Sequence, residues 1–332
     1  MPGPVRTLPL LLFAALWAGC GVFAGDPDPT PTPTATATRT ATVTPTATDT
    51  PTPTETPTFT PTLEPPPQPT PRPARGYLEI AQGESTVLRV TGNAASGVAT
   101  FEGRETAMLP MAGGFWAVLG VGADHATGQF PVQVRLLGAG GETVHEETQQ
   151  LTVLGGSYPV EYITVPPDQT GLLDPAVAQQ EAAARAGVFA GFTGERLWSG
   201  PFVLPVQSYI SSSYGIFRSY NGGPVASYHH GTDFPVDPGT PVAAGNAGRV
   251  VFAAALPVRG VSVIIDHGAG VFSGYHHLQS AAVGGGQTVS TGQIIGYSGA
   301  SGLATGPHLH WEVIVHGQEV DPMQWTYAEI GP

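Results

Sequence analysis

The feature that most constrains this chain is a short run near its C-terminus, Gly306-Pro307-His308-Leu309-His310-Trp311-Glu312-Val313. The run is rich in strand-forming residues, and side chains along a strand alternate between two faces. His308 and His310 should therefore share one face, with Leu309 and Trp311 on the other. A strand with a buried apolar face would hold the two imidazoles rigidly in a cleft. A surface strand with two solvated histidines is the alternative for an isolated His-x-His pair.

Length and charge limit the classes of function that need consideration. The chain has 332 residues, which allows two domains plus extensions. Its net charge is −13, and all 12 basic residues are arginines. Because no basic stripe is available to follow a phosphate backbone, a nucleic-acid partner is not expected. The single cysteine, Cys20, excludes an intrachain disulfide.

Residues 1–20 have the pattern of an export signal. An arginine precedes an apolar run over residues 8–18, which is too short to span a bilayer comfortably. Cys20 stands where a bacterial lipoprotein signal places its acylated cysteine, although Trp17 replaces the leucine-like residue of that pattern. We expect an exported protein of the cell envelope, anchored to the membrane by lipid on Cys20. A plain cleaved signal and an uncleaved anchor are the alternatives.

Residues 21–75 are expected to form a disordered linker. Threonine occupies every even position from Thr30 to Thr62, and proline occupies many of the odd ones. Alternating threonine alone would favour a strand, but proline removes the donors that a β-ladder needs. The composition instead favours an extended, largely polyproline-like chain. At ~3.1 Å per residue it would reach on the order of 150 Å, far enough for a domain to work away from an anchor.

Residues 76–156 are expected to form a small β domain. Apolar residues at 130, 132, 134 and 136 alternate with polar residues and one proline, the pattern of a half-buried strand. Four further strands are expected at residues 86–90, 97–101, 114–119 and 150–154. Glycine-rich turns at short spacing favour a β-sandwich, and the domain resembles immunoglobulin-like modules of bacteria.

Residues 157–200 are expected to connect this domain to the next. Asp174-Pro175 predicts a helix start, because an N-cap residue is followed by proline at the first helical position. Residues 176–186 favour a helix, and Gly187 is suited to end it. No pattern in this segment predicts chemistry.

Residues 201–332 are β-rich, punctuated by glycine, and hold eight of the ten histidines. Three clusters stand out: His229 with Asp233, Asp266-His267-Gly268 followed by Tyr275-His276-His277-Leu278, and the pair His308 and His310. Zinc hydrolases hold their metal by three protein ligands and leave the fourth position to water. A base must take the proton of that water, and a donor must stabilise the oxyanion. His229, Asp233 and one of His308 and His310 could be the ligands, leaving two histidines for the proton work.

The chain from about residue 211 to residue 325 resembles the lysostaphin/LytM-type zinc metallopeptidases. Four family patterns occur in order and at the family's spacing. They are His-x-Gly-x-Asp at His229-His230-Gly231-Thr232-Asp233, Tyr-x-His-Leu at Tyr275-His276-His277-Leu278, Gly-x-x-Val-x-x-Gly-x-x-Ile-Gly from Gly286 to Gly296, and Thr-Gly-x-His-Leu-His-x-Glu from Thr305 to Glu312. Such order and spacing over more than a hundred residues make coincidence a poor explanation.

The resemblance implies the roles of five residues. His229, Asp233 and His310 correspond to the zinc ligands, and His277 and His308 to the catalytic pair that handles the water proton and the oxyanion. Which of the two is the base stays open. The resemblance also implies that the protein is mainly β, with a C-terminal antiparallel β-sheet metallopeptidase domain at 201–332 after the immunoglobulin-like sandwich.

Several residues near these motifs have an open role. The family often has Phe-Gly-x-Arg early in the domain, but this chain is one residue longer before Arg218, which puts a substrate role for that arginine in doubt. Tyr228 and Tyr275 could line a peptide groove or pack on the sheet. Glu312 shares a face with His310, so it could orient that histidine or form a surface pair. Four histidines match no family position and are expected at the surface, with only one of them, His267, expected to support the ligands: His230, His267, His276 and His316.

The implied function is zinc-dependent hydrolysis of peptide bonds in bacterial peptidoglycan. A non-catalytic activator of other wall hydrolases is an alternative, because some relatives have lost metal ligands; here all five positions are present. A protease of a secreted protein is the other alternative. Nothing in the sequence predicts which bond is cleaved, what the β domain binds, whether a pro-segment covers the groove, or the oligomeric state.

Overall fold

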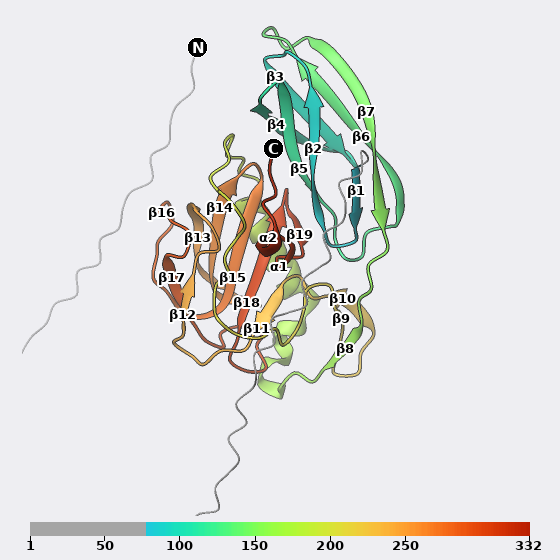
Figure 1. Cartoon of the computed structure of the whole chain (residues 1–332). Coiled ribbons are helices and arrows are strands. Elements are labelled where there is room, and N and C mark those ends of the chain that lie inside the picture. The colour runs from blue at the N-terminus through green and yellow to red at the C-terminus, as the bar shows by residue number, and fades with distance from the viewer. Residues whose placement is uncertain (1–77) are drawn as a thin grey trace, which may run out of the picture. The chain divides into compact units, whose positions relative to one another are not determined.

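The computed structural model of the chain describes residues 78–332 (Figure 1). The expected signal (1–20), its Cys20 and the expected linker (21–75) lie outside the described residues. Within 78–332 the protein is mainly β, as expected from the sequence. None of the helices in this part of the chain has the length and apolar character needed to cross a bilayer.

The first strands form one seven-stranded arrangement in the order β1-β7-β6-β3-β4-β5-β2. Its strands are β1 (Leu78–Ala81), β2 (Ser85–Thr91), β3 (Ser96–Phe101), β4 (Arg104–Met111), β5 (Gly114–Gly120), β6 (Gly128–Leu137) and β7 (Thr143–Leu154). The alternation expected in β6 is confirmed, since Val132, Val134 and Leu136 are each 0% exposed. β1 and β4 were not expected. Because β4 pairs with both β3 and β5 and links the strands into one path, the immunoglobulin-like interpretation stays a prediction.

The connecting segment contains three elements, and each contacts the C-terminal part of the chain. They are β8 (Val160–Ile163), the 3-10 helix η1 (Pro167–Leu173) and α1 (Pro175–Phe189). α1 begins as expected: the side chain of Asp174 accepts a hydrogen bond from the Ala176 amide at 2.8 Å. It continues two residues beyond Gly187, which therefore does not end it. β8 joins β9 (Phe217–Tyr220) and β10 (Val225–Tyr228) in a three-stranded sheet.

The remaining strands build a nine-stranded sheet whose pairings are all antiparallel, as expected. Its main path is β11-β18-β15-β14-β13-β16, with β17 beside β15 and β12, and β19 beside β18. The elements are β11 (Thr232–Phe234), β12 (Pro241–Ala243), β13 (Gly248–Leu256), β14 (Gly260–Gly268), β15 (Val271–Ala281), β16 (Thr288–Val289), β17 (Ile294–Ser298), β18 (Leu309–Val315), β19 (Gln318–Val320) and the short helix α2 (Gln324–Tyr327).

Strand β18 shows how the two faces of this sheet differ. Leu309, Trp311 and Val313 are 0% exposed and belong to a large apolar core, to which β4 and β5 also contribute side chains. On the opposite face Ile314 packs in a small apolar cluster that is covered by Phe189 of α1. His310 and Glu312 also lie on that opposite face, because strand side chains alternate. The sheet therefore carries one apolar face and one face where polar groups meet α1.

Candidate metal centre

Three potential metal ligands converge at one end of the polar face. β11 pairs with β18 so that Asp233 lies opposite His310, and the loop after β10 carries His229 beside them. The Nε2 atom of His229 lies 3.0 Å from Asp233 Oδ1 and 2.9 Å from His310 Nδ1. His310 Nδ1 lies 2.7 Å from Asp233 Oδ1. All three side chains are buried, so the fold holds two imidazoles and a carboxylate together away from water.

This donor set fits a zinc ion. The three ligand atoms all lie within 4.8 Å of one another. Zinc prefers imidazole nitrogen and carboxylate oxygen in groups of three when one position is to stay open for water or substrate. Gly231 makes the convergence possible, because a Cβ atom at this position would meet the Trp311 carbonyl oxygen and the His310 ring.

Hydrogen bonds on the far side of each ring set which nitrogen faces the centre. His229 Nδ1 lies 2.9 Å from the Ser213 carbonyl oxygen, to which it donates. His310 Nε2 lies 3.0 Å from Glu312 Oε1. A ring nitrogen that donates outward leaves the other nitrogen with its lone pair directed inward, the form that a metal needs. The expectation that Glu312 orients His310 agrees with this geometry, and the surface-pair alternative is wrong because Glu312 is 0% exposed.

Burial and neighbouring charges shift the pKa values of these groups. Burial lowers the pKa of His229 to about 4, which keeps the ring neutral. Burial alone would raise the pKa of Asp233, but His229 and His310 hold it well below its ordinary value. Burial is likewise outweighed at His310, where hydrogen bonds to Asp233 and Glu312 raise the pKa. The centre thus presents an ionised carboxylate and a neutral imidazole at neutral pH.

His277 and His308 lie together beside the three converging residues. Their ring centroids are 4.7 Å apart, and His277 lies 5.9 Å from the ring of His310. His277 Nδ1 is 2.7 Å from the Ser301 carbonyl oxygen, and His308 Nδ1 is 2.8 Å from the Gly306 carbonyl oxygen. Each Nδ1 donates to a backbone oxygen, so each Nε2 is left with a lone pair. Burial lowers the pKa of His277 well below its ordinary value and favours its neutral form.

A β-bulge brings two adjacent histidines to the same face. The pairing of β14 with β15 shifts register between Tyr275 and Leu278, and His277 has a φ of 57°. A bulge adds one residue to a strand and re-aims the side chains around it. It returns Leu278 to the apolar core while both His276 and His277 contact the polar face. Simple alternation would have separated these two histidines.

The structure corrects several expectations for the other histidines. His276 is 0% exposed, and its Nε2 lies 3.2 Å from Glu312 Oε2, so it supports the metal centre rather than the surface. His267 was expected to support the ligands, but its buried ring contacts the Ala247 carbonyl oxygen and the Ser273 hydroxyl instead. His230 pairs with Glu319 at 3.6 Å. His316 stacks on Phe192.

The structure also shows the surroundings of two tyrosines and one arginine whose roles the sequence left open. Tyr275 is 0% exposed, and its hydroxyl accepts a hydrogen bond from the Gly245 amide at 2.6 Å. Tyr228 packs in a small cluster with Tyr214. Packing is therefore the correct interpretation for both tyrosines. Arg218 does reach the centre despite the extra residue before it, because its guanidinium donates to Asp233 Oδ2 at 3.2 Å.

Two contributions from the connecting segment were not anticipated. Glu161 of β8 lies 3.4 Å from Arg218, and Arg185 of α1 lies 2.5 Å from Glu312. These pairs join residues far apart in the chain, so no local spacing reveals them. The one available signal was the Glu181 and Arg185 pair, spaced at i and i+4 in a helix otherwise rich in alanine.

Comparisons with known proteins agree with this site. Residues 227–322 match the model of peptidase family M23. The peptidoglycan DD-endopeptidase ShyA of Vibrio cholerae is 43% identical over 115 residues, which cover 35% of this chain and 27% of that protein. The DD-carboxypeptidase/endopeptidase Mpg of Neisseria meningitidis is 36% identical over 118 residues, which cover 36% of this chain and 27% of that protein. The chain thus spans about a quarter of the length of the curated relatives it matches.

The similarity of fold extends beyond the matched segment. A solved structure of an M23 peptidase from Pseudomonas aeruginosa superposes with a TM-score of 0.57 at 26% identity. The superposition covers 75% of this chain and 95% of that one. The similarity therefore includes residues outside 227–322.

Proposed function

We propose that the protein is a zinc-dependent endopeptidase that hydrolyses peptide bonds of bacterial peptidoglycan, since residues 227–322 match the model of peptidase family M23. The observation that carries the proposal is the convergence of His229, Asp233 and His310 within 4.8 Å, beside a second pair of histidines. The names of the relatives support the substrate class, because ShyA is a peptidoglycan DD-endopeptidase.

We assign the metal to His229 Nε2, His310 Nδ1 and Asp233. Zinc bound by three such ligands lowers the pKa of a water molecule and polarises a carbonyl group. Asp233 is held in place by Arg218 and His310 is held by Glu312, so the ligands need little rearrangement. Their burial keeps bulk water from competing for the same atoms.

We assign proton transfer to His277 and His308. Each ring donates from Nδ1 to a backbone carbonyl oxygen, which fixes its tautomer and leaves Nε2 as the basic atom. One Nε2 accepts the proton of the attacking water, and the ring that is then protonated donates toward the charge that develops on the scissile carbonyl oxygen or toward the leaving amine. With ring centroids 4.7 Å apart, the two histidines are close enough to act on the same peptide bond.

The rest of the chain suits a substrate outside the cell membrane. We propose an export signal at residues 1–20, lipid on Cys20, and a flexible tether over 21–75. We also propose a β domain at 76–156, a connector at 157–200 and the catalytic domain at 201–332. A lipid-anchored enzyme on such a tether would search the wall while staying bound to the membrane. The variant Cys20→Ser tests the anchor: it should leave the membrane fraction or fail to mature, and fractionation like the parent would contradict lipid attachment.

Two other functions are separated from the proposal by one experiment. A non-catalytic activator would release nothing from purified peptidoglycan, and a protease of a secreted protein would cleave a casein-like protein instead. The purified full chain, loaded with zinc, is incubated with purified sacculi and in parallel with casein. We expect new peptide termini from the sacculi, identified by mass spectrometry, and none from the matched His308→Ala variant. Release from casein alone, or from neither substrate, would contradict the proposal.

A further inference from the structure

Helix α1 is unusual in what it buries. An amphipathic surface helix normally turns an apolar stripe toward the core. Among the residues of α1, those that are buried are Glu181 and Arg185, while Val188 and Phe189 near its end are only partly covered. Burying an ion pair in place of apolar side chains seldom adds stability. The position of these two charges therefore calls for a reason other than packing.

The charge of Arg185 is directed at Glu312. Its NH2 group donates to Glu312 Oε2 at 2.5 Å. Arg259 approaches the other oxygen of the same carboxylate, with its Nε atom 2.8 Å and its NH2 group 2.6 Å from Oε1. Glu181 is the partner of Arg259, at 2.9 Å. α1 thus supplies one guanidinium to Glu312 directly and helps to hold the second in place.

Glu312, held by the two arginines, in turn holds the ring of His310. Its Oε1 atom accepts from His310 Nε2 at 3.0 Å, while Nδ1 of the same ring is directed toward Asp233. Rotation of the His310 ring would break one of these two contacts. A carboxylate clamped by two guanidinium groups therefore fixes both the tautomer and the angle of the ring.

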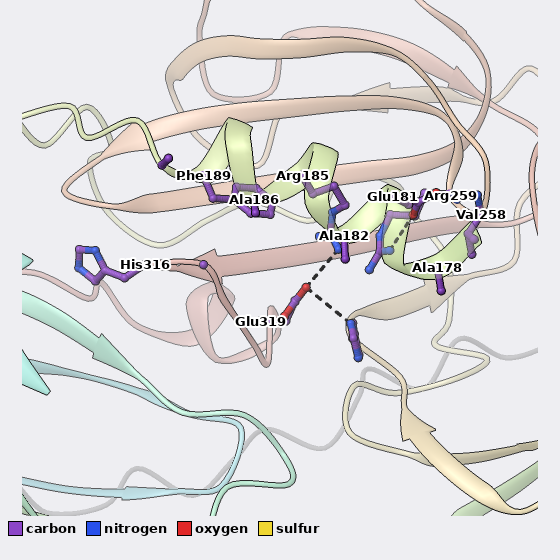
Figure 2. A pocket seen from close by; sticks show the side chains of 13 residues that line it. Ala178, Glu181, Ala182, Arg185, Ala186, Phe189, Val258, Arg259, His316 and Glu319 are labelled. Atoms are coloured by element: carbon purple, nitrogen blue, oxygen red, sulfur yellow. Dashed lines mark hydrogen bonds and ion pairs between the residues drawn. The ribbon is translucent and has the colours of Figure 1, made fainter. Parts of the chain in front are cut away.

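Through Glu319, Arg185 is also linked to the segment that carries His229. Its NH1 group lies 3.1 Å from Glu319 Oε1, and the same oxygen lies 3.6 Å from Nδ1 of His230, the neighbour of His229. Figure 2 shows Glu319 paired with Arg185 of the helix, and Arg259 paired with Glu181. A cavity of about 640 Å³ lies beside Arg185, lined partly by alanines of α1. The Arg185 guanidinium also lies over the Phe189 ring, 5.1 Å from its centroid, and its ion pairs with Glu312 and Glu319 set its direction.

We propose that Arg185 is a positioning residue of the metal centre, which acts through Glu312 to hold the His310 ring with Nδ1 directed inward. The residue lies outside the segment that matches the peptidase family. The inference rests on the proposed role of His310 as a metal ligand. It makes α1 part of the machinery of this chain rather than a spacer between two domains.

The test compares zinc affinity in variants of the full chain, measured by competition with a chelator. Arg185→Met removes the guanidinium and keeps an aliphatic side chain. Gln180→Met is the matched control, because it places the same side chain at an exposed position of the same helix. We expect Arg185→Met to bind zinc about 10-fold more weakly, the lower end of the loss usual for outer partners of metal-bound histidines. Gln180→Met should bind like the parent.

Two further readouts separate positioning from general stabilisation. The visible spectrum of bound cobalt(II) should change in Arg185→Met and stay the same in Gln180→Met, because it reports the geometry of the ligands. Arg185→Lys keeps the charge without the two-pronged geometry and should recover part of the affinity. If Arg185→Met does not fold, the zinc affinity of Arg185→Lys is compared with that of the parent. Arg185→Lys should bind zinc more weakly than the parent, and an equal affinity would contradict the positioning role.

The outcomes also distinguish this inference from the proposed function. Parental zinc affinity and cobalt spectrum in a folded Arg185→Met protein, with only a lower melting temperature, would overturn the positioning role. Weaker zinc binding by this variant, in a chain whose parent leaves peptidoglycan uncleaved, would support the positioning role and contradict the proposed substrate. A parent chain that binds no zinc would overturn both.

Discussion

The two cores of this protein differ in the kinds of side chain that they bury. Between residues 78 and 154 the buried side chains are apolar with the single exception of Ser85. The nine-stranded sheet has a largely apolar core on one face, where His267 and Ser273 are also buried. Its other face buries histidines and paired charges, among them His276, His310 and Glu312. Burying such groups costs free energy unless they are paired. Stability alone accounts for the first core, whereas the proposed metal site and reaction would account for the polar face of the second.

The largest expected effect sharpens this contrast on the polar face. His308→Ala should lower kcat by about 10²–10⁴-fold, the range for loss of a proton-transfer group. Metal content should stay at the parental level, because His308 is not one of the three converging ligands. Turnover and zinc content of the purified variant are measured together. Equal loss of metal in His308→Ala and His310→Ala would mean that the two histidines have been given the wrong roles.

The next effect tests the apolar core. Leu136 of β6 is 0% exposed, and Leu136→Ala should lower the free energy of unfolding by about 2–5 kcal/mol through lost contacts and a cavity. Zinc affinity should not change, since Leu136 belongs to an apolar cluster separate from that of the nine-stranded sheet. Urea denaturation measures the free energy of unfolding, and competition with a chelator measures the zinc affinity. The exposed Gln133→Ala on the same strand is the control, expected within about 0.5 kcal/mol of the parent. Weaker zinc binding by Leu136→Ala would break the separation of the two regions.

The smallest effect concerns one of the places where the two regions touch. The backbone amide of Asp321 donates to the Gly83 carbonyl oxygen at 2.7 Å, and Glu84 lies close by. Burial raises the pKa of Asp321 from 3.8 to about 6, and Glu84 adds to the shift. The folded protein therefore binds this proton more tightly than the unfolded chain does. The stabilisation from that proton is complete below about pH 4 and is lost as the pH rises through 6.

Asp321→Asn should consequently stabilise the protein at pH 7.5, by about 1–2 kcal/mol after allowing for partial exposure. The asparagine side chain can still accept the hydrogen bond that Asp321 Oδ1 receives from the Met323 amide. The gain should vanish below about pH 3, where the carboxyl group is neutral in both states. Urea titrations at the two pH values give the comparison, and an equal gain at both would rule out the proton as its cause.

Short-range patterns in the sequence predicted the elements well. The alternation of β6, the N-cap at Asp174 and the division of the His308–Trp311 run between two faces follow from backbone geometry within a few residues. Leu309 and Trp311 are indeed 0% exposed. The five site residues were named from motif spacing, and the structure brings them together; their roles stay predictions.

Long-range pairings and irregular backbone were beyond the same patterns. The contact of Arg185 with Glu312 joins residues separated by 127 positions, and periodicity carries no information about such a partner. The role of His276 depends on the bulge at His277, which a simple alternation excludes. β4 was missed because its strand divides its pairing between β3 and β5, so its burial does not alternate cleanly.

Metal binding tests the central claim most directly, because the polar face has its explanation only if it holds an ion. Zinc is titrated into the metal-free full chain and its stoichiometry is measured by calorimetry and elemental analysis. We predict one tightly bound zinc per chain in the parent and in His308→Ala, and none in His310→Ala or Asp233→Ala. A parent chain that contains no zinc and takes up none on titration would contradict the account.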